Sequence, residues 1–515
     1  MRVALPAAPS TLDPVLALAP VDRFVVRQLW EPLFRFGPQP DPEPAAAVSA
    51  EPDGEGRRWT FTLRPGLRWP GGGQGAGPQA GAPGGGPLEA QDFVRGWQRA
   101  LSRSVPDDLF AAFRPILGAG VYRAGLVEGD VLGLRAPTPE TLLVELEAPG
   151  AHFRHVAALW LGAPAPAPDS PTGPFGPQGN GPFQVLSWAS ERIRLVPNPD
   201  YASGAPGGPL ELVTSPDAPA AALTDLAAPG MGPSSRLADV VPVPEALAGA
   251  VLRDPRLASG LLRQVPPATL WLTCNVEREP LDKALVRKAL ACVVDRTAYV
   301  ERALQGAGVP AHSLLPPGCP GHDPGAGATY VDQPEVARAL LHAAGVDLER
   351  LQAVRLTVPA TAAGRVAAEA VLGGIQRRLG VRLGLQEVDR YAYVRLLEQR
   401  RFDLAFGGWE SPYPDPEGWF WLVFGAGKAE NRSGWESPAL DRLWRDADGT
   451  VDPQARLALY RAAQQVLLEE MPVLFLAHPL RLAAVDPRVS GLTASTMDEL
   501  TGAAALSRAR LLPGV

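Results

Sequence analysis

The chain has little cysteine and little histidine, and both shortages exclude kinds of site. Its 515 residues contain three cysteines and six histidines. Cys274, Cys292 and Cys319 are odd in number and share no CxxC spacing, so we predict buried free thiols rather than a disulfide framework. His152 and His155 could share a helix face, but no carboxylate or cysteine stands beside them at ligand spacing. We therefore expect a partly exposed structural pair, no metal and no cofactor.

Long apolar runs, basic charge and enzyme signatures are also missing. No apolar stretch reaches the roughly 18 residues that span a bilayer. The net charge of −7 offers no basic surface for nucleic acid or an anionic membrane. There is no Walker loop, dinucleotide fingerprint, GxSxG elbow or HExxH motif. The start, MRVALPAAPSTLDP, lacks the pattern of a signal peptide, so either an export signal has been trimmed or the protein is cytosolic.

Length and composition indicate a folded chain of several parts. A single hydrophobic core serves a chain of up to about 250–300 residues. This chain has 515 residues, so at least two domains are expected. The apolar share of 46% excludes a wholly disordered chain. Residues 70–87, rich in glycine and proline, predict a mobile surface loop. A second such stretch, 162–182, predicts a crossover between structural blocks.

Hydrophobic periodicity predicts an α/β fold with a mixed sheet. In the first part we expect helices at 22–34 and 89–101, and strands at 59–63, turning into 67–69, and at 142–146, 183–186 and 193–196. In the second part we expect strands at 270–272, 354–358, 381–388, 402–406 and 473–477. Helices are expected between them at 283–293, 335–344, 365–379, 391–399 and 453–471.

The stretch FDLAFGGWESPYPDPEGWFWLVF, residues 402–424, is the leading candidate for a ligand site. A strand pattern ends at two glycines and is followed by aromatic residues, carboxylates and prolines. Aromatic rings give contact area at low rotamer cost, and prolines reduce the entropy lost on binding. Open α/β sheets also place their sites at the carboxyl ends of strands. The alternative is an aromatic cluster under a long loop, and we expect Trp419 and Trp421 to be core.

Short signatures follow one another along the chain in a fixed order. In the first half they are STLDP (10–14), LWEPLF (29–34), WTFTLRPGLRW (59–69), LEAQDF (88–93), GNGPF (179–183) and NPDY (198–201). In the second half they are Asn275, PLDKALVRKALACVVDR (280–296), LPPG (315–318), the segment 403–416, Asn431 and three segments of the closing helices. Together they resemble the extracytoplasmic solute-binding proteins of ABC importers, in the oligopeptide, dipeptide and nickel-binding group.

The resemblance implies a two-lobed α/β fold, the periplasmic-binding-protein-like fold of class C, type II. Its two lobes would be joined by a two-strand hinge, and the first lobe would carry an extra subdomain. Lobe one would hold residues 1–38, 181–268 and 479–515, the extra subdomain residues 39–180, and lobe two residues 269–478. The crossover and the short final segment predicted from composition agree with this division.

The function implied by the resemblance is solute capture for transport. A peptide or similar small solute would bind between the lobes, shift them toward a closed form and be delivered to a membrane permease of an ABC transporter. No bond is made or broken, so we expect no enzyme. We expect a monomer that works outside the cytoplasm, in the periplasm or as a cell-surface lipoprotein. Its membrane contact would come only through the permease or a lipid anchor.

The resemblance also implies candidate ligand-binding residues. They are Trp409, Glu410, Ser411, Tyr413, Asp415, Trp271, Asn275, Asn431 and Asp22. In peptide-binding relatives an aspartate three residues after the tryptophan pairs with the peptide amino group, but here Pro412 stands there. Glu410 or Asp415 would have to replace it, and Asp415 has the alternative role of a capping acceptor. Asn275 and Asn431 have the alternative role of tying loops together, and Asp22 that of a helix N-cap.

Two other functions stay open at this point. A cytosolic ligand sensor on the same fold would explain the missing signal peptide. A hydrolase could use Glu410 and Asp415 as paired carboxylates with Tyr413 as a proton donor, although no nucleophile–base pair emerges. Nickel or a nickel chelate as solute finds little support among the histidines.

Overall fold

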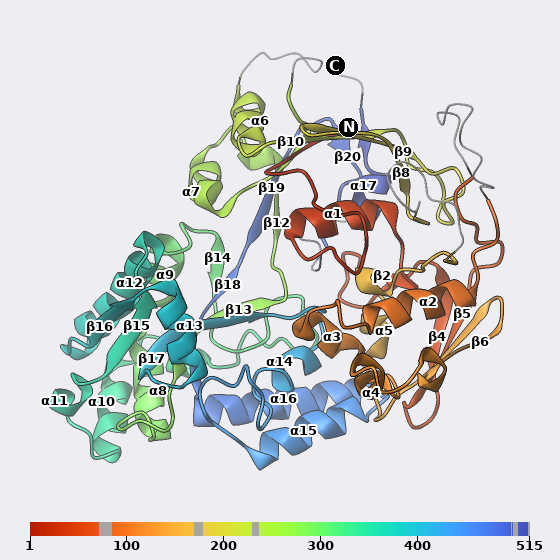
Figure 1. Cartoon of the computed structure of the whole chain (residues 1–515). Coiled ribbons are helices and arrows are strands. Elements are labelled where there is room, and N and C mark those ends of the chain that lie inside the picture. The colour runs from red at the N-terminus through yellow and green to blue at the C-terminus, as the bar shows by residue number, and fades with distance from the viewer. Residues whose placement is uncertain (72–84, 169–178, 229–235, 496, 498–502, 513–515) are drawn as a thin grey trace. The chain divides into compact units, whose positions relative to one another are not determined.

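The computed structural model describes residues 1–71, 85–168, 179–228, 236–495, 497 and 503–512. The chain divides into two compact units, residues 1–264 with 481–515 (unit 1) and residues 265–480 (unit 2). It passes into unit 2 after Gln264 and returns after Leu480 (Figure 1). Helices and strands alternate through both units, so the predicted two-lobed α/β fold class is confirmed.

Unit 1 is organised around a seven-stranded mixed sheet. The order is β12-β19-β11-β1-β10-β9-β8, in which β1 runs parallel to β10 and β11 and the other pairs are antiparallel. The strands are β1 (Arg2–Leu5), β8 (Phe183–Ala189), β9 (Arg192–Pro197), β10 (Leu210–Thr214), β11 (Val240–Pro242), β12 (Leu261–Gln264) and β19 (Arg481–Val485). Helices α6 (Ala218–Ala227) and α7 (Glu245–Arg253) contribute buried side chains to its core.

A second sheet of unit 1 is antiparallel and has the order β4-β5-β7-β6. Its strands are β4 (Ala47–Pro52), β5 (Arg58–Leu63), β6 (Leu134–Thr138) and β7 (Thr141–Glu145). The nearby helices are α2 (Ala90–Ala100), α3 (Asp107–Phe113), α4 (Ala119–Arg123) and α5 (Phe153–Val156). Alternation along β5 turns Trp59 and Phe61 inward, where they meet Trp97 of α2 and Phe153. This sheet falls within residues 39–180, and their assignment to an extra subdomain stays a prediction.

Short elements complete unit 1. They are α1 (Pro20–Leu29), β2 (Phe34–Arg35), β3 (Glu43–Pro44), β20 (Val489–Ser490), α17 (Ala503–Arg508) and β21 (Arg510–Leu511). The strands β2 and β3 pair with each other, as do β20 and β21.

Unit 2 has a six-stranded mixed sheet, as the alternation of strands and helices predicts. The order is β14-β18-β13-β17-β15-β16. Its strands are β13 (Ala268–Cys274), β14 (Gly308–Pro310), β15 (Arg355–Pro359), β16 (Gly384–Val388), β17 (Leu404–Glu410) and β18 (Val473–Pro479). The parallel pairs are β15 with β16 and β15 with β17, whereas β13 is antiparallel to both of its neighbours.

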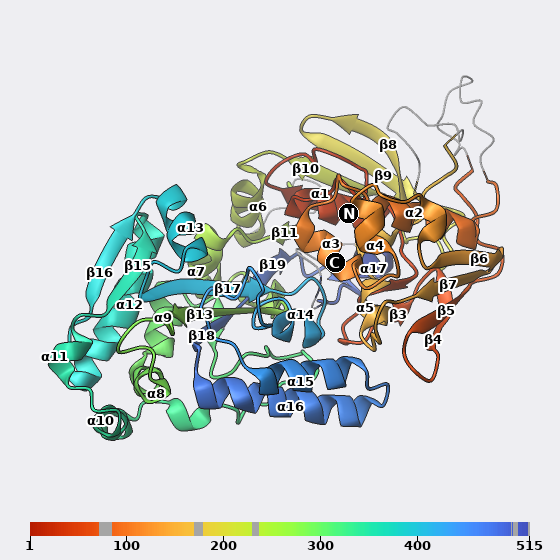
Figure 2. The same cartoon turned by 60° about the horizontal axis from the view of Figure 1, so that its bottom comes forward.

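Several helices of unit 2 begin where the sequence supplies a capping oxygen. Thr361, Ser437 and Asp452 each accept a hydrogen bond from the first turn of the helix that follows. The helices are α8 (Ala284–Val293), α9 (Arg296–Arg302), α10 (Pro334–Ala343), α11 (Leu348–Leu351), α12 (Ala362–Leu379), α13 (Arg390–Glu398), α14 (Glu417–Phe420), α15 (Pro438–Asp448) and α16 (Pro453–Glu470). The last two lie side by side (Figure 1, Figure 2).

Two arginines of the signature at 280–296 are buried and donate to backbone carbonyls. Arg287 donates to the carbonyls of Glu470, Met471, Leu281 and Asp282. Arg296 donates to those of Ala311, Phe475 and Ala291, among others. Each guanidinium therefore ties together segments that lie far apart in the chain, which gives this signature a structural role in unit 2.

Some predictions about local structure are wrong. Helix α1 ends at Leu29 rather than at residue 34, because Trp30 is extended and Pro32 follows. Residues 67–69 do not return as a strand beside β5, whose neighbours are β4 and β7. His152 and His155 are buried rather than partly exposed. The predicted mobile loop at 70–87 lies mostly outside the described residues.

The three cysteines are free and buried, as predicted. Burial raises the pKa of the Cys274 thiol to about 12 and that of Cys292 to about 11. None of the helices in the described ranges combines the length and the apolarity that a bilayer crossing requires.

Candidate functional site

Strand β17 of unit 2 is longer than predicted. The prediction ended it at the two glycines, but the strand continues through them to Glu410 and pairs with β13 along its whole length. Gly407 permits this because a Cβ there would lie 2.6 Å from Thr273 Oγ1 and 2.7 Å from Trp271 Nε1. Gly407 therefore allows β17 to continue as a strand up to Trp409 instead of ending the strand.

The opposite edge of β17 loses its neighbour halfway along the strand. Strand β15 pairs with β17 only at Leu404 and Ala405. From Phe406 to Glu410, no strand of the described residues pairs with this edge. Tyr393 of α13 donates a hydrogen bond to the Phe406 carbonyl at 2.7 Å. After Phe406, the backbone N–H and C=O groups of β17 on this edge could pair with an added extended chain.

Two of the predicted residues reach the surface of unit 2 on this segment. Trp409 is half-buried and packs against the main core of unit 2, and Glu410 is exposed at the end of the strand. In the pairing of β17 with β13, Trp409 lies opposite Thr269 and Glu410 lies opposite Ala268. An indole side chain and a carboxylate next to an open strand edge can hold an apolar group and a cation.

The next three predicted residues are buried in the turn after β17. Asp415 is completely buried, and both its oxygens accept from Arg456, at 2.6 and 2.7 Å. It also caps the backbone N–H of Glu417. The Tyr413 hydroxyl donates to the Glu417 carboxylate at 2.5 Å. Ser411 is held through its backbone, which donates to Pro267 O.

This arrangement bears on the hydrolase alternative. A paired-carboxylate mechanism would need Asp415 to bind a water or a substrate oxygen, but Arg456 engages both of its oxygens. Burial alone would lower the pKa of Arg456, but the charge of Asp415 outweighs this effect and raises it. Besides this ion pair, Asp415 has the capping role that the sequence allowed for it.

Three predicted residues elsewhere in unit 2 are also buried and bonded within it. Trp271 donates to Thr273 Oγ1. Asn275 donates to the carbonyls of Arg400 and Phe402, and Asn431 donates to the carbonyl of Trp435. Both asparagines tie loops together, the alternative role that we gave them.

Asp22 of unit 1 is buried in the first turn of α1. It does not cap this helix, because the N-cap position belongs to Ala19. Its two oxygens accept instead from the backbone N–H of Ser10, at 2.6 Å, and from the Ser10 hydroxyl, at 2.7 Å. Asp22 therefore fixes the loop that contains the first signature.

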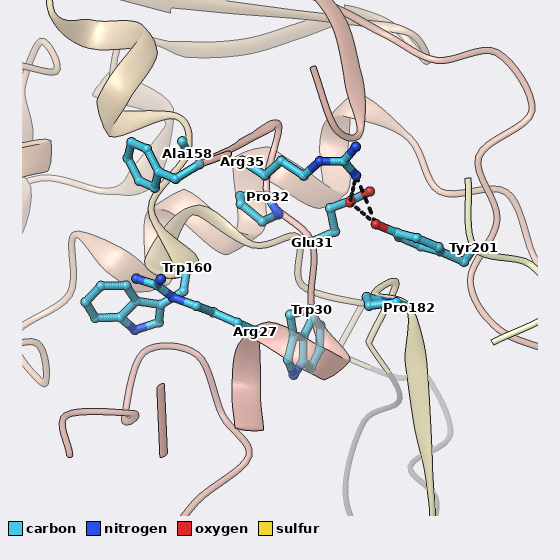
Figure 3. A pocket seen from close by; sticks show the side chains of 10 residues that line it. Arg27, Trp30, Glu31, Pro32, Arg35, Ala158, Trp160, Pro182 and Tyr201 are labelled. Atoms are coloured by element: carbon cyan, nitrogen blue, oxygen red, sulfur yellow. Dashed lines mark hydrogen bonds and ion pairs between the residues drawn. The ribbon is translucent and has the colours of Figure 1, made fainter. Parts of the chain in front are cut away.

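Unit 1 contains a pocket that the sequence did not predict (Figure 3). Its volume is about 50 Å³. The residues that line it include Arg27, Trp30, Glu31, Arg35, Trp160 and Tyr201. We call it the unit 1 pocket.

One side of the unit 1 pocket is a buried network around Glu31. The Tyr201 hydroxyl donates to Glu31 Oε1 at 2.5 Å, and Arg35 lies 3.3 Å from the same oxygen (Figure 3). Arg35 also lies 3.6 Å from Glu43. Burial raises the pKa of Glu31, although the hydrogen bond from Tyr201 and the charge of Arg35 oppose this shift. Burial, together with the charge of Glu31, also raises the pKa of Tyr201.

The network is where three of the signatures meet. Glu31 belongs to LWEPLF and Tyr201 to NPDY, and Asn180 of GNGPF exchanges two hydrogen bonds with the Glu31 backbone. A Cβ on Gly179 or Gly181 would overlap the Leu29 backbone, so this approach requires glycine. The three motifs are therefore the signal in the sequence that points to this pocket, but only the fold brings them together.

The other side of the unit 1 pocket has arginine side chains over an indole. The guanidinium carbon of Arg27 lies 5.2 Å from the ring centre of Trp160 (Figure 3). That of Arg23, one turn earlier in α1, lies 5.3 Å from the same ring. Arg27 also donates to the Met497 carbonyl at 2.8 Å. Cations over the face of a tryptophan are stabilised by its quadrupole.

A buried histidine lies at the end of β18, two residues before the chain leaves unit 2. His478 Nδ1 lies 3.1 Å from Thr269 Oγ1 and 3.3 Å from the Ala268 carbonyl. The Thr269 hydroxyl donates to the Leu314 carbonyl, so the His478 ring must be the donor to Thr269. Burial, together with the nearby His322 and His312, lowers the pKa of His478 to about 4, although the hydrogen bond with the Ala268 carbonyl opposes the shift.

We expect His478 to make unit 2 less stable in acid. The unfolded chain takes up this proton near the ordinary pKa of 6.5 and the folded chain only near 4, so stability falls as the pH drops through that interval. The full effect is roughly 3 kcal/mol. Denaturant titrations at pH 7 and pH 4 measure the free energy of unfolding. Between these pH values it should fall further in wild type than in His478→Asn, by this amount. The exposed histidine His342 provides the control, because His342→Gln should behave as wild type. Equal losses in wild type and His478→Asn would contradict the assignment.

Comparison with known proteins places the chain among solute receptors. The family model described as "Bacterial extracellular solute-binding proteins, family 5 Middle" matches residues 41–431. The oligopeptide-binding protein OppA of Bacillus subtilis is 25% identical over 494 residues, covering 92% of this chain and 86% of that protein. The periplasmic murein peptide-binding protein MppA of Escherichia coli is 26% identical over 481 residues, covering 90% of this chain and 85% of that protein.

Solved structures show the same fold. The unliganded open form of the murein tripeptide-binding protein MppA superimposes with a TM-score of 0.85 at 23% identity, covering 99% of this chain and 97% of that one. The clavulanic acid biosynthesis oligopeptide-binding protein 2 gives a TM-score of 0.80 at 21% identity, covering 99% and 95%. Because the family model matches well over half of the sequence, the chain belongs to the bacterial extracellular solute-binding proteins of family 5.

Proposed function

We propose that this protein is the receptor of an ABC importer, that its solute is a peptide, and that it delivers this solute to a membrane permease. The relatives named above for oligopeptide and murein peptide binding support the choice of solute. We place its work outside the cytoplasm, since one of them is named as periplasmic. Closure on the solute would bend the chain at its two crossings between the units, after Gln264 and after Leu480.

The open edge of β17 is the observation that carries the proposal. From Phe406 to Glu410 the strand is held on one side by β13, and β15 no longer pairs with the other side. A peptide in extended conformation would add to this edge through its main chain, which gives affinity for many sequences. The half-buried indole of Trp409 would pack against it.

Glu410 would bind the amino group of the peptide. The family position for this role is Pro412 here, and Asp415 is occupied by Arg456. Glu410 is exposed at the end of the same strand, next to Trp409. An ammonium group that loses water on binding needs a carboxylate nearby, so Glu410 is the residue that would supply it.

We expect Glu410→Gln to weaken binding of trialanine about 10-fold, since a charge-assisted hydrogen bond contributes roughly 1.5–3 kcal/mol. N-acetylated trialanine, which has no ammonium group, should bind both forms equally. Titration calorimetry measures both affinities. The control is Glu335→Gln, at an exposed position of α10. If Glu410→Gln left the affinity for free trialanine unchanged, another group would have to bind the amine.

A further inference from the structure

The backbone groups of β17 alternate between its two edges. The Asp403 carbonyl, just before the strand, accepts from the N–H of Asn275, which directly follows β13. Because β17 and β13 pair residue by residue along their whole length, the odd-numbered residues of β17 all direct their N–H and C=O groups toward β13. Phe406 and Gly408 therefore direct theirs toward the opposite edge, which β15 leaves open after Ala405.

The carbonyl of Phe406 is already in use at the start of this open edge. With β15 in its observed register, the next hydrogen bond of the ladder would run from the N–H of residue 359 to this carbonyl, but Pro359 has no N–H. The Tyr393 hydroxyl donates to the carbonyl instead, at 2.7 Å. Burial raises the pKa of Tyr393, so the hydroxyl keeps its proton and remains a donor. An added chain therefore finds no vacant acceptor at Phe406.

Helix α13 holds Tyr393 in this position without being part of the core. It packs against β15 and lies beside β17 (Figure 1, Figure 2), yet none of its side chains is fully buried. Asp389 fixes its start by accepting from the N–H groups of Tyr391 and Ala392. Residues two apart in a helix point in nearly opposite directions, and the Tyr391 side chain is 82% exposed. The helix thus places one tyrosine on the strand edge and the other in solvent.

Gly408 is the next residue of β17 that offers both backbone groups to the open edge. Within the described residues, no hydrogen bond reaches its N–H or C=O from this side. A peptide whose first residue lies opposite Glu410 runs antiparallel to β17, so its third residue lies opposite Gly408 and exchanges two hydrogen bonds with it. A fifth residue would lie opposite Phe406, where Tyr393 occupies the acceptor. Main-chain pairing therefore ends with the third residue.

We propose that Tyr393 selects the solute by length, because it ends the open edge of β17 and leaves main-chain pairing for three residues of a peptide. The inference rests on the proposed function, since it takes the solute as a peptide with its amino group at Glu410. An edge that stayed open beyond Phe406 would add affinity with each further pair of hydrogen bonds. Here the affinity should grow up to the tripeptide and no further.

Titration calorimetry with alanine peptides of two to five residues tests the proposal. For wild type we expect trialanine to bind about 10-fold more tightly than dialanine, because the third residue adds two hydrogen bonds. Pentaalanine should bind within about twofold of trialanine. Tyr393→Ala exposes the Phe406 carbonyl and removes the ring beside it, so pentaalanine should bind this variant about 3- to 10-fold more tightly than trialanine does. Tyr393→Phe, which loses only the hydroxyl, should show part of this gain.

A matched control comes from the same helix. Tyr391→Phe loses a hydroxyl at an exposed position and should keep the wild-type dependence on length. Both Tyr393 variants should stay folded, because α13 has no fully buried side chain, and circular dichroism checks this. A wild-type affinity that keeps rising to pentaalanine, or equal affinities of trialanine and pentaalanine in both Tyr393 variants, would overturn the inference while peptide binding itself persists. Failure of every peptide to bind wild type would overturn the proposed function and the inference with it.

Discussion

Replacing Trp409 by alanine is expected to weaken peptide binding by a factor of about 30 to 1,000, equivalent to about 2–4 kcal/mol. The indole is half-buried at the end of β17, beside the edge that β15 leaves open. Tryptophans in such positions dominate binding energies because they bury a large area at low entropic cost. Titration calorimetry with trialanine gives the two dissociation constants.

Two variants make the result for Trp409 specific. Trp409→Phe should retain part of the affinity, because a smaller ring still covers part of the same surface. Trp444→Ala, which removes a partly buried indole from α15, should leave the affinity within about twofold of wild type. An unchanged dissociation constant in Trp409→Ala would place the peptide elsewhere.

Breaking the buried ion pair after β17 should be the most damaging change to the stability of unit 2. In Asp415→Asn the guanidinium of Arg456 stays buried and loses its charged partner, and we expect the free energy of unfolding to fall by about 3–5 kcal/mol. Chemical denaturation followed by tryptophan fluorescence measures the change. Since the same carboxylate caps the Glu417 backbone, the turn that follows Trp409 should loosen as well.

Removing both charges distinguishes the effect of the ion pair on stability from the effect of the packing around it. The double variant Asp415→Leu with Arg456→Met leaves no unpaired charge, so it should recover a large part of the loss. Glu335→Gln, which removes one partner of an exposed pair on α10, should change the stability little. A double variant as unstable as Asp415→Asn would show that the charges are not the cause.

The sequence predicted the order of elements well where local signals are strong. Apolar spacing predicted helices at 365–379 and 453–471, and α12 and α16 lie there, each preceded by a capping side chain, Thr361 and Asp452. The prediction was wrong where contacts with a neighbouring element determine the local structure. Gly407 and Gly408 are typical strand breakers, but β13 pairs with β17 through both glycines and keeps the strand extended. The end of α1 was missed for a related reason, because Leu33 and Phe34 continue the apolar spacing after Trp30 has already left the helix.

The candidate site was predictable only in part. The segment after residue 402 was recognised, yet its composition could not tell the exposed Glu410 from Asp415, which is fully buried. That difference depends on Arg456, which lies 41 residues later in the sequence. The unit 1 pocket was missed because its walls come from segments near residues 30, 160 and 201, and no local pattern links them.

The most direct test of the account is titration calorimetry of the purified protein with a mixed library of dipeptides to pentapeptides. The account predicts saturable heat at about one peptide per chain, with the bound peptides recovered chemically unchanged. No heat and no shift in thermal midpoint with any member of the library would contradict it.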